Sequence, residues 1–306
     1  MPSLRSNGFN IEYESLGDPG APVILLIMGL GMQLIAWPDT FCRHLVDRGF
    51  RVIRFDNRDA GLSGQVKSSK RPNLVWAMLA TRLKLPLHSP YSLGDMADDA
   101  AGLLDGLGIR RAHVVGASMG GMIAQVLAAR FPQRVLSLTS IMSSSGNPRV
   151  SRPRGDALKA LLSRPADPHN PEIVIAHLVR VFGVIGSPGF PADRAELRER
   201  VDRAVRRAYY PAGVARQLMA VIASGDLRPL LKTIVAPTLV IHGAADALVP
   251  LSAGQDTANN IPGANLLVIE GMGHDLPTAL CERLASAIAS HCGAANQNVQ
   301  QSSGLQ

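Results

Sequence analysis

Short, uninterrupted apolar runs recur along the chain, separated by longer segments in which apolar residues follow a helical spacing. Val23–Met28 is apolar throughout, which is typical of a strand buried on both faces of a sheet. Phe9–Leu16 alternates instead and ends at a Gly- and Pro-rich turn, which predicts a strand followed by a turn. Further short runs predict strands at residues 51–55, 112–115, 135–142, 238–241 and 266–269.

Helical segments are expected between these strands. Ser92 with Asp95 three positions on predicts a capped helix over 92–107, and Gly108 ends it. Apolar spacing predicts other helices at residues 38–48, 120–130 and 276–291. Strands that alternate with helices pack as a parallel sheet with helices on both faces, so the pattern predicts an α/β fold.

The alternation of strands and helices breaks after the strand at 135–142. The chain there is rich in Pro and Arg and mainly helical, with Leu197, Val201 and Val205 on one apolar stripe. We therefore predict a helical cap at residues 147–227, inserted into a core made of residues 1–146 and 228–293. Residues 294–306 are small and polar, which predicts a disordered tail.

The composition indicates a soluble globular protein. Of the 306 residues, 46% are apolar and 18% are charged, which is enough for a sizeable core and argues against disorder. The N-terminus lacks the pattern of a signal peptide, and the longest apolar run, 21–37, is broken by Gly and Gln and is shorter than the roughly 20 residues of a membrane span. We expect a cytoplasmic protein without stable membrane association.

The cysteines and the charge add no binding function. Three widely spaced cysteines form neither a disulfide framework nor a zinc site, and we expect no metal. The net charge is +7, but most of the excess lies between residues 147 and 226, where Arg is interleaved with Glu and Asp at helical spacing. A salt-bridged helix face explains this charge better than nucleic-acid binding, because no nucleic-acid motif accompanies it.

The most informative motif is Gly116-Ala117-Ser118-Met119-Gly120. It matches G-x-S-x-G, a tight turn between a strand and a helix that exposes the serine hydroxyl at the edge of a sheet. Positions two residues from the serine must lack bulky side chains, and both are glycine. A predicted strand precedes the motif and a predicted helix follows it, so Ser118 is the candidate nucleophile.

A serine nucleophile needs a base and an acid that orients the base. His274 and Asp246 each follow a predicted strand, where open α/β sheets place their sites, and they come after Ser118 in the order Ser, acid, His. Asp226 is the alternative acid, although no strand precedes it. We interpret His242 as a structural hydrogen-bonding group at a strand end.

Two backbone N–H groups are expected to stabilise the oxyanion formed during attack on a carbonyl. One is that of Met119, at the start of a helix, and the other is that of Leu30, in the glycine-rich loop after Val23–Met28. The segment 56–63 also follows a strand, and we interpret its Arg and Asp residues as a structural network near the pocket.

Methionines cluster in and beside the predicted site loops. If Met28, Gly29 and Met272 contact the substrate, the flexible Met side chains would accept several short to medium acyl groups. The alternative is that the methionines fill gaps in the core.

These motifs together resemble the α/β-hydrolase superfamily over most of residues 20–290. The segments MGLGMQLIAWPD, AHVVGASMGGMIAQ, PTLVIHGAADALVP and GMGHDLP are similar to the branch that includes aclacinomycin methylesterase and bacterial carboxylesterases. The resemblance implies a mostly parallel, eight-stranded twisted sheet, a helical lid, and ester hydrolysis without a cofactor by Ser118, Asp246 and His274, with Leu30 and Met119 as oxyanion donors. That branch tends to have glycine at the position of Leu30.

Ester hydrolysis of a small-molecule substrate is thus the predicted function, and several alternatives stay open. Perhydrolase or haloperoxidase-like chemistry, C–C bond hydrolysis and iminopeptidase activity could use the same three residues. A non-catalytic binding protein would more often have lost one of them. The sequence does not distinguish a monomer from a homodimer.

Overall fold

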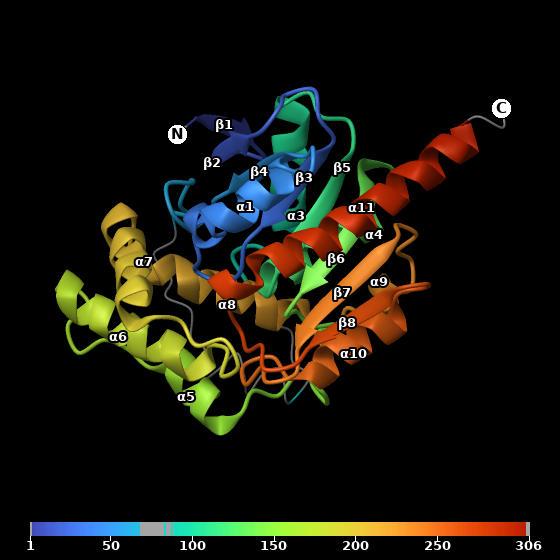
Figure 1. The fold of residues 1–306 in the computed structure, drawn as a ribbon. Helices are drawn as coiled ribbons and strands as arrows, with labels where there is room; N and C mark the ends of the chain where they lie inside the picture. Colours follow the sequence, from blue (N-terminus) through green and yellow to red (C-terminus); the bar gives the residue numbers. More distant parts are fainter. Residues whose placement is uncertain (1, 68–82, 84–86, 88, 304–306) are drawn as a thin grey trace.

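A single mixed sheet organises the protein. The computed structural model describes residues 2–67, 83, 87 and 89–303. Its eight strands lie in the order β1-β2-β4-β3-β5-β6-β7-β8, and all neighbours from β4 to β8 are parallel, while β1 and β2 are antiparallel additions at one edge (Figure 1). The strands are β1 (Ser3–Ser6), β2 (Phe9–Leu16), β3 (Val23–Ile27), β4 (Arg51–Phe55), β5 (Ala112–Ala117), β6 (Val135–Ile141), β7 (Thr238–Gly243) and β8 (Asn265–Ile269). The mostly parallel, eight-stranded sheet predicted from the sequence is confirmed.

Helices cover both faces of the sheet. Helices α1 and α11 pack together on one face, and α3 and α4 pack together on the other, where α9 and α10 continue the layer (Figure 1). The helices of the core are α1 (Asp39–Val46), α3 (Leu93–Gly106), α4 (Met119–Arg130), α9 (Arg228–Leu231), α10 (Leu251–Asn260) and α11 (Cys281–Ser303), with short 3-10 turns at Leu34–Ala36, Pro132–Arg134 and Thr278–Leu280. Helix α3 begins at the predicted capping box of Ser92 and Asp95.

The central strand explains why the sequence is apolar at every position there. In β3, Val23, Leu25 and Ile27 belong to the apolar cluster beneath α3 and α4, whereas Ile24 and Leu26 belong to the cluster beneath α1 and α11. All five residues are buried. A strand with helices on both sides must present apolar side chains to both. Because β3 pairs in parallel with β5, the carboxyl ends of the two strands lie side by side.

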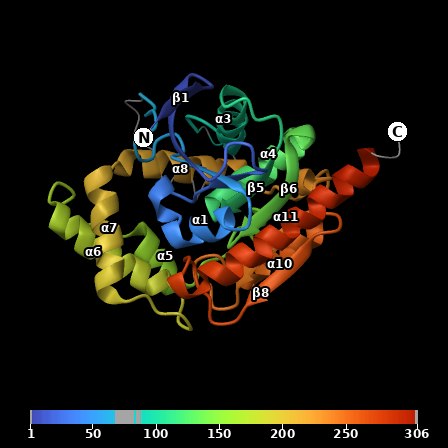
Figure 2. The same cartoon turned by 45° about the horizontal axis from the view of Figure 1, so that its top comes forward.

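Four helices precede α9 in the chain between β6 and β7. They are α5 (Gly155–Leu162), α6 (Pro171–Ile185), α7 (Arg194–Arg207) and α8 (Pro211–Ser224). Helices α5, α6 and α7 group to one side of the sheet, as both views show (Figures 1 and 2). Hydrogen bonds connect this segment to loops that follow β4 and β8, so it lies over the carboxyl ends of the strands.

The C-terminal segment differs from the prediction of a disordered tail at 294–306. Helix α11 continues to Ser303, and residues 304–306 lie outside the described residues. Ala, Gln and Asn in this segment are compatible with a helix, and no Pro or Gly interrupts it between Ala294 and Ser303. The polar composition therefore reflects a helix that extends beyond the core. No helix in the described part of the chain is long and apolar enough to span a membrane.

Candidate active site

The turn between β5 and α4 holds Ser118 in a strained conformation. Its φ is +54° and its ψ is −123°, a region that residues with a side chain rarely occupy. The strain is maintained by close packing, because a Cβ at Gly116 would lie 2.1 Å from the Gly120 carbonyl oxygen, and a Cβ at Gly120 would lie 2.1 Å from that of Ile27. Only glycine fits at either position.

Three predicted residues meet at the carboxyl edge of the sheet. His274 Nε2 lies 3.0 Å from Ser118 Oγ, and His274 Nδ1 lies 2.8 Å from Asp246 Oδ2. Ser118 follows β5, Asp246 follows β7 and His274 follows β8, so residues far apart in sequence are joined by the parallel order of the strands. The arrangement can move a proton from the hydroxyl to the imidazole and stabilise the resulting imidazolium.

The Asp246 carboxylate is fixed on both oxygens. Its Oδ1 accepts hydrogen bonds from the Leu248 N–H at 2.9 Å and the Val249 N–H at 2.8 Å, which leaves Oδ2 for His274. His242 lies behind it, with Nε2 2.8 Å from the Val249 carbonyl oxygen and 3.7 Å from Asp246 Oδ2. Burial lowers the pKa of His242, which favours a neutral ring in this position.

The glycine-rich loop after β3 runs directly past the nucleophile. A Cβ at Gly29 would lie 3.1 Å from Ser118 Cβ and 3.6 Å from Ser118 Oγ. Neither the Leu30 N–H nor the Met119 N–H has a hydrogen-bond acceptor among the described residues, and that of Met119 lies at the start of α4. Two free N–H groups beside Ser118 can bind a negatively charged oxygen.

Ion pairs join the 56–63 segment to its surroundings. Asp59 accepts both hydrogen bonds of a bidentate pair with Arg216 of α8, at 2.8 and 2.9 Å. Arg58 forms a similar pair with Asp99 of α3, and Asp56 binds Arg207 at 2.7 Å. The segment therefore ties the cap helices to the core, in keeping with the structural network predicted for it.

The loop that carries His274 is held by the end of α6. The His274 N–H donates to the Ile185 carbonyl oxygen at 2.8 Å, and the Gly273 N–H donates to Ser187 Oγ, also at 2.8 Å. The Ser187 hydroxyl in turn donates to the partly buried Asp275 carboxylate. Burial raises the pKa of Asp275, which faces the cap and not the imidazole.

Two predicted substrate contacts are not supported by the packing. Met272 is completely buried and Met28 is 5% exposed, and both belong to the core cluster beneath α1 and α11. A side chain without accessible surface fills the core, so the packing of Met272 gives no support to its role as a contact residue. Gly29 does lie beside Ser118. Asp226, the alternative acid, pairs with Arg228 on the surface.

Other polar groups near the site were not identified from the sequence. Ser143 Oγ donates to the Ser118 carbonyl oxygen at 2.7 Å, and Gln217 Oε1 accepts from the Gly31 N–H at 2.7 Å. Ser143 follows β6, the strand next to β5, so its position at a strand end was an available signal. Gln217 lies within a cap helix and carried no such signal.

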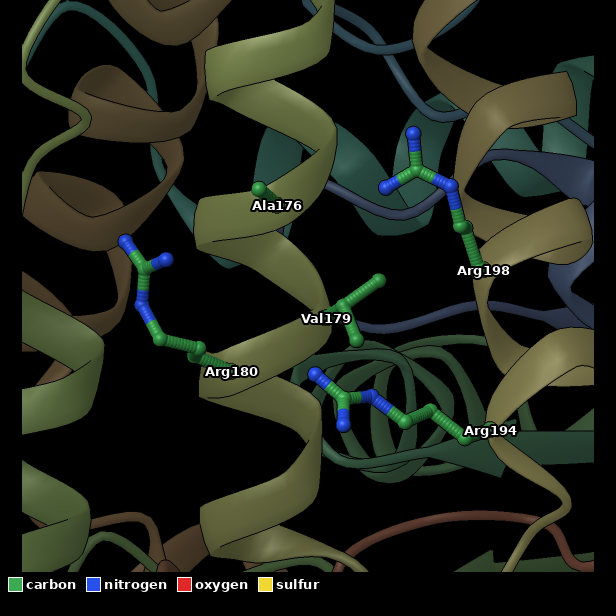
Figure 3. Close-up of a pocket in the computed structure, with 5 residues that line it drawn as sticks. All are labelled: Ala176, Val179, Arg180, Arg194 and Arg198. Carbon is green, nitrogen blue, oxygen red and sulfur yellow. The ribbon is translucent and has the colours of Figure 1, made fainter.

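A separate cavity of about 210 Å³ lies between α6 and α7. It is lined by Ala176, Val179, Arg180, Arg194 and Arg198, and Figure 3 shows the guanidinium groups extending from the two helices. Arg198 pairs with Glu172 at 2.6 Å, and all the arginines are exposed. None of these residues contacts Ser118, Asp246 or His274. Among the described residues, no group of three His, Cys, Asp or Glu side chains is arranged to hold a metal.

Comparisons with known proteins agree with this architecture. A family described as the alpha/beta hydrolase fold matches residues 22–167. The chain is 33% identical to rhodomycin D methylesterase of Streptomyces peucetius over 95% of this chain and 98% of that protein. It is 26% identical to a 2-hydroxy-6-oxononadienedioate/2-hydroxy-6-oxononatrienedioate hydrolase of a Pseudomonas species, over 87% and 85% of the two chains. The crystal structure of an enol-lactonase from Burkholderia xenovorans LB400 superimposes with a TM-score of 0.70 at 23% identity, over 95% and 99%.

Proposed function

The chain belongs to the α/β-hydrolase family, and we propose that within it the protein is a serine hydrolase that cleaves carboxylic esters through an acyl-enzyme. One observation carries the proposal: His274 lies 3.0 Å from Ser118 Oγ on one side and 2.8 Å from Asp246 on the other. A base within hydrogen-bond distance of the nucleophile, itself oriented by a carboxylate, is the arrangement that acyl transfer requires.

The proposed reaction has two halves. His274 Nε2 takes the proton of Ser118 as Oγ attacks the ester carbonyl, and the N–H groups of Leu30 and Met119 stabilise the oxyanion. The imidazolium gives its proton to the departing alkoxide, which leaves an acyl group on Ser118. A water molecule, deprotonated by the same imidazole, then hydrolyses the acyl-enzyme and restores the hydroxyl.

The identity to a methylesterase favours esters over the other substrates of this fold. We propose short to medium acyl chains, and Met28 and Met272 no longer support broad tolerance because they fill the core. The range of acyl chains that the protein accepts therefore has to be measured directly. A panel of p-nitrophenyl esters from acetate to decanoate varies the acyl group, and methyl and ethyl esters of one acid vary the alcohol.

The panel is run on the wild type and on Ser118→Ala. We expect hydrolysis of several short and medium esters by the wild type, and a loss of at least about 10³ in kcat for the variant. A sharp optimum, with losses of many hundredfold on either side, would refute the proposed tolerance alone. A folded wild type that hydrolyses no ester and is not labelled by a fluorophosphonate probe would refute the serine hydrolase proposal and favour a binding protein.

A C–C bond hydrolase is the second candidate, because the name of the Pseudomonas relative makes it a hydrolase of 2-hydroxy-6-oxononadienedioate. The same three residues could serve that reaction. Adding a vinylogous 1,5-diketone to the panel separates the two, since a C–C hydrolase would prefer it to every simple ester.

A further inference from the structure

Cap helix α8 contributes one buried amide that reaches the loop beside the nucleophile. Gln217 is completely buried. Its Oε1 accepts from the Gly31 N–H at 2.7 Å, and its Nε2 donates to the Arg58 carbonyl oxygen at 2.8 Å. The two partners determine the orientation of the amide, because an N–H must meet the oxygen and a carbonyl must meet the NH₂ group.

The hydrogen bond lies at the centre of a tight turn. The Met32 N–H donates to the Gly29 carbonyl oxygen at 3.2 Å, which closes a β-turn with Leu30 and Gly31 at its middle positions. Gly31 has a φ of +66°, as the third residue of a type II turn requires. Rotation of the Leu30–Gly31 peptide would convert this turn to type I and direct the Gly31 N–H away from Gln217. The amide therefore favours one of the two turn conformations.

The turn has little rigidity of its own. Glycines flank Leu30 on both sides, and glycine loses more conformational freedom than any other residue when it is ordered. Helix α8 packs closely over the turn, since a Cβ at Gly31 would lie 2.8 Å from Val214 Cγ2. A second side-chain anchor is Asn57 Nδ2, which donates to the Met28 carbonyl oxygen at 2.8 Å.

We infer that Gln217 is a positioning residue for the oxyanion hole. It acts through the Gly31 N–H: by holding the Leu30–Gly31 peptide it limits movement of the turn, and therefore displacement of the preceding Gly29–Leu30 peptide, whose N–H is directed toward the carbonyl attacked by Ser118. The inference rests on the proposed function. Helix α8 thereby supports the loop of the oxyanion hole. Because the pair of Arg216 with Asp59 holds α8 in place, the position of this helix affects oxyanion binding.

Two substitutions at Gln217 test the inference. Gln217→Met keeps the length of the side chain and removes both hydrogen bonds. Loss of an oxyanion donor lowers kcat by about 10²–10³, and misorientation costs less, so we expect kcat to fall about 10- to 100-fold with little change in KM. Gln217→Glu in its neutral form can still accept from Gly31 and donate to Arg58, and should retain more activity than Gln217→Met.

A transition-state analogue separates positioning from general damage. A trifluoromethyl ketone adds to Ser118 and creates an oxyanion, so its Ki should rise in Gln217→Met by the same factor by which kcat/KM falls. Ser224→Ala is the control, because it removes a hydroxyl that donates to the Ala220 carbonyl oxygen at the end of the same helix, away from the turn and from the pair of Arg216 with Asp59. Its kcat and Ki should equal those of the wild type.

The outcomes are distinct. Unchanged kcat and Ki in folded Gln217→Met would overturn the inference, as would a lower kcat with an unchanged Ki. A wild type without Ser118-dependent hydrolysis would instead overturn the proposed function. If Gln217→Met does not fold, amide exchange in the wild type still decides: the Gly31 N–H should be protected and the Leu30 N–H should exchange faster, and the reverse order would contradict the assignment.

Discussion

Asp246 presents one carboxylate oxygen to the backbone and the other to His274. Oδ1 accepts from two N–H groups, and Oδ2 lies 2.8 Å from His274 Nδ1. The carboxylate cannot rotate without losing the two backbone hydrogen bonds. The imidazole therefore carries its proton on Nδ1, and Nε2 is left as the acceptor that faces Ser118.

This asymmetry predicts the effect of Asp246→Asn. The two backbone N–H groups would keep the amide oxygen in the place of Oδ1, which turns the NH₂ group toward His274 Nδ1. The imidazole would then protonate on Nε2 and could not accept the proton of Ser118. We expect kcat for ester hydrolysis to fall about 10⁴-fold with the fold intact, as measured by steady-state kinetics and circular dichroism.

Asp226→Asn is the control for that experiment. The sequence analysis gave Asp226 as the alternative to Asp246, and in the structure Asp226 pairs with Arg228 at the surface. Its substitution should leave kcat unchanged. A large loss in Asp226→Asn together with an active Asp246→Asn would show that the acid has been misassigned.

Gly120, in the turn between β5 and α4, and Gly183, in α6, predict opposite effects of a glycine-to-alanine substitution. In Gly120→Ala the new Cβ would meet the carbonyl oxygens of Ile27 at 2.1 Å and Met28 at 2.7 Å, so we expect a loss of at least about 2 kcal/mol in the free energy of unfolding. Gly183 is exposed within α6 and has no neighbour within 4 Å of such a Cβ. Gly183→Ala should stabilise by up to about 1 kcal/mol. Urea denaturation measures both changes, and equal effects would contradict the close packing described for the turn between β5 and α4.

The pair between Asp59 and Arg216 predicts a non-additive loss of stability. The two side chains are 0% and 3% exposed. Arg216→Met would leave the Asp59 carboxylate buried without its cation, at a cost of about 3–5 kcal/mol in the free energy of unfolding. The double variant Asp59→Asn, Arg216→Met should recover much of that loss, because no unpaired charge remains. Urea denaturation of the four proteins of this cycle gives the coupling energy, and strict additivity would rule out a direct interaction.

Buried histidines predict that stability decreases in acid. Burial lowers the pKa of His113 from 6.5 to about 4. Between these values the unfolded chain binds more protons than the folded one, so the free energy of unfolding falls as the pH drops from 6.5 toward 4, by up to about 3 kcal/mol for this group. Burial also lowers the pKa of His242 and His291, which adds to the effect.

His113→Asn tests this contribution. We expect a shallower dependence of unfolding free energy on pH over that range, because the remaining histidines still titrate. His113 is completely buried, and the smaller Asn would leave part of its space unfilled, so stability at neutral pH should also decline. An unchanged slope would mean that His113 is protonated equally in the folded and unfolded states.

Local patterns in the sequence determined the framework of this protein. Continuous apolar runs predicted strands such as β3 because a strand covered on both faces must be apolar on both, and Gly-Ala-Ser-Met-Gly predicted the turn at Ser118 because the backbone there excludes a Cβ on either side. Placement after strands also predicted that His274 and Asp246 would lie near Ser118, since parallel strands end at one edge.

The tertiary structure alone decided which distant groups support that site. Gln217 and Gly31 are separated by 186 positions, and nothing in the spacing of α8 distinguishes this amide from a solvated one. The burial of Met272 could not be predicted from the sequence either, because it depends on how α11 packs on the sheet. Periodicity reports which face of an element is apolar. It does not report which residues of another element that face will meet, because those contacts are set by the path of the whole chain.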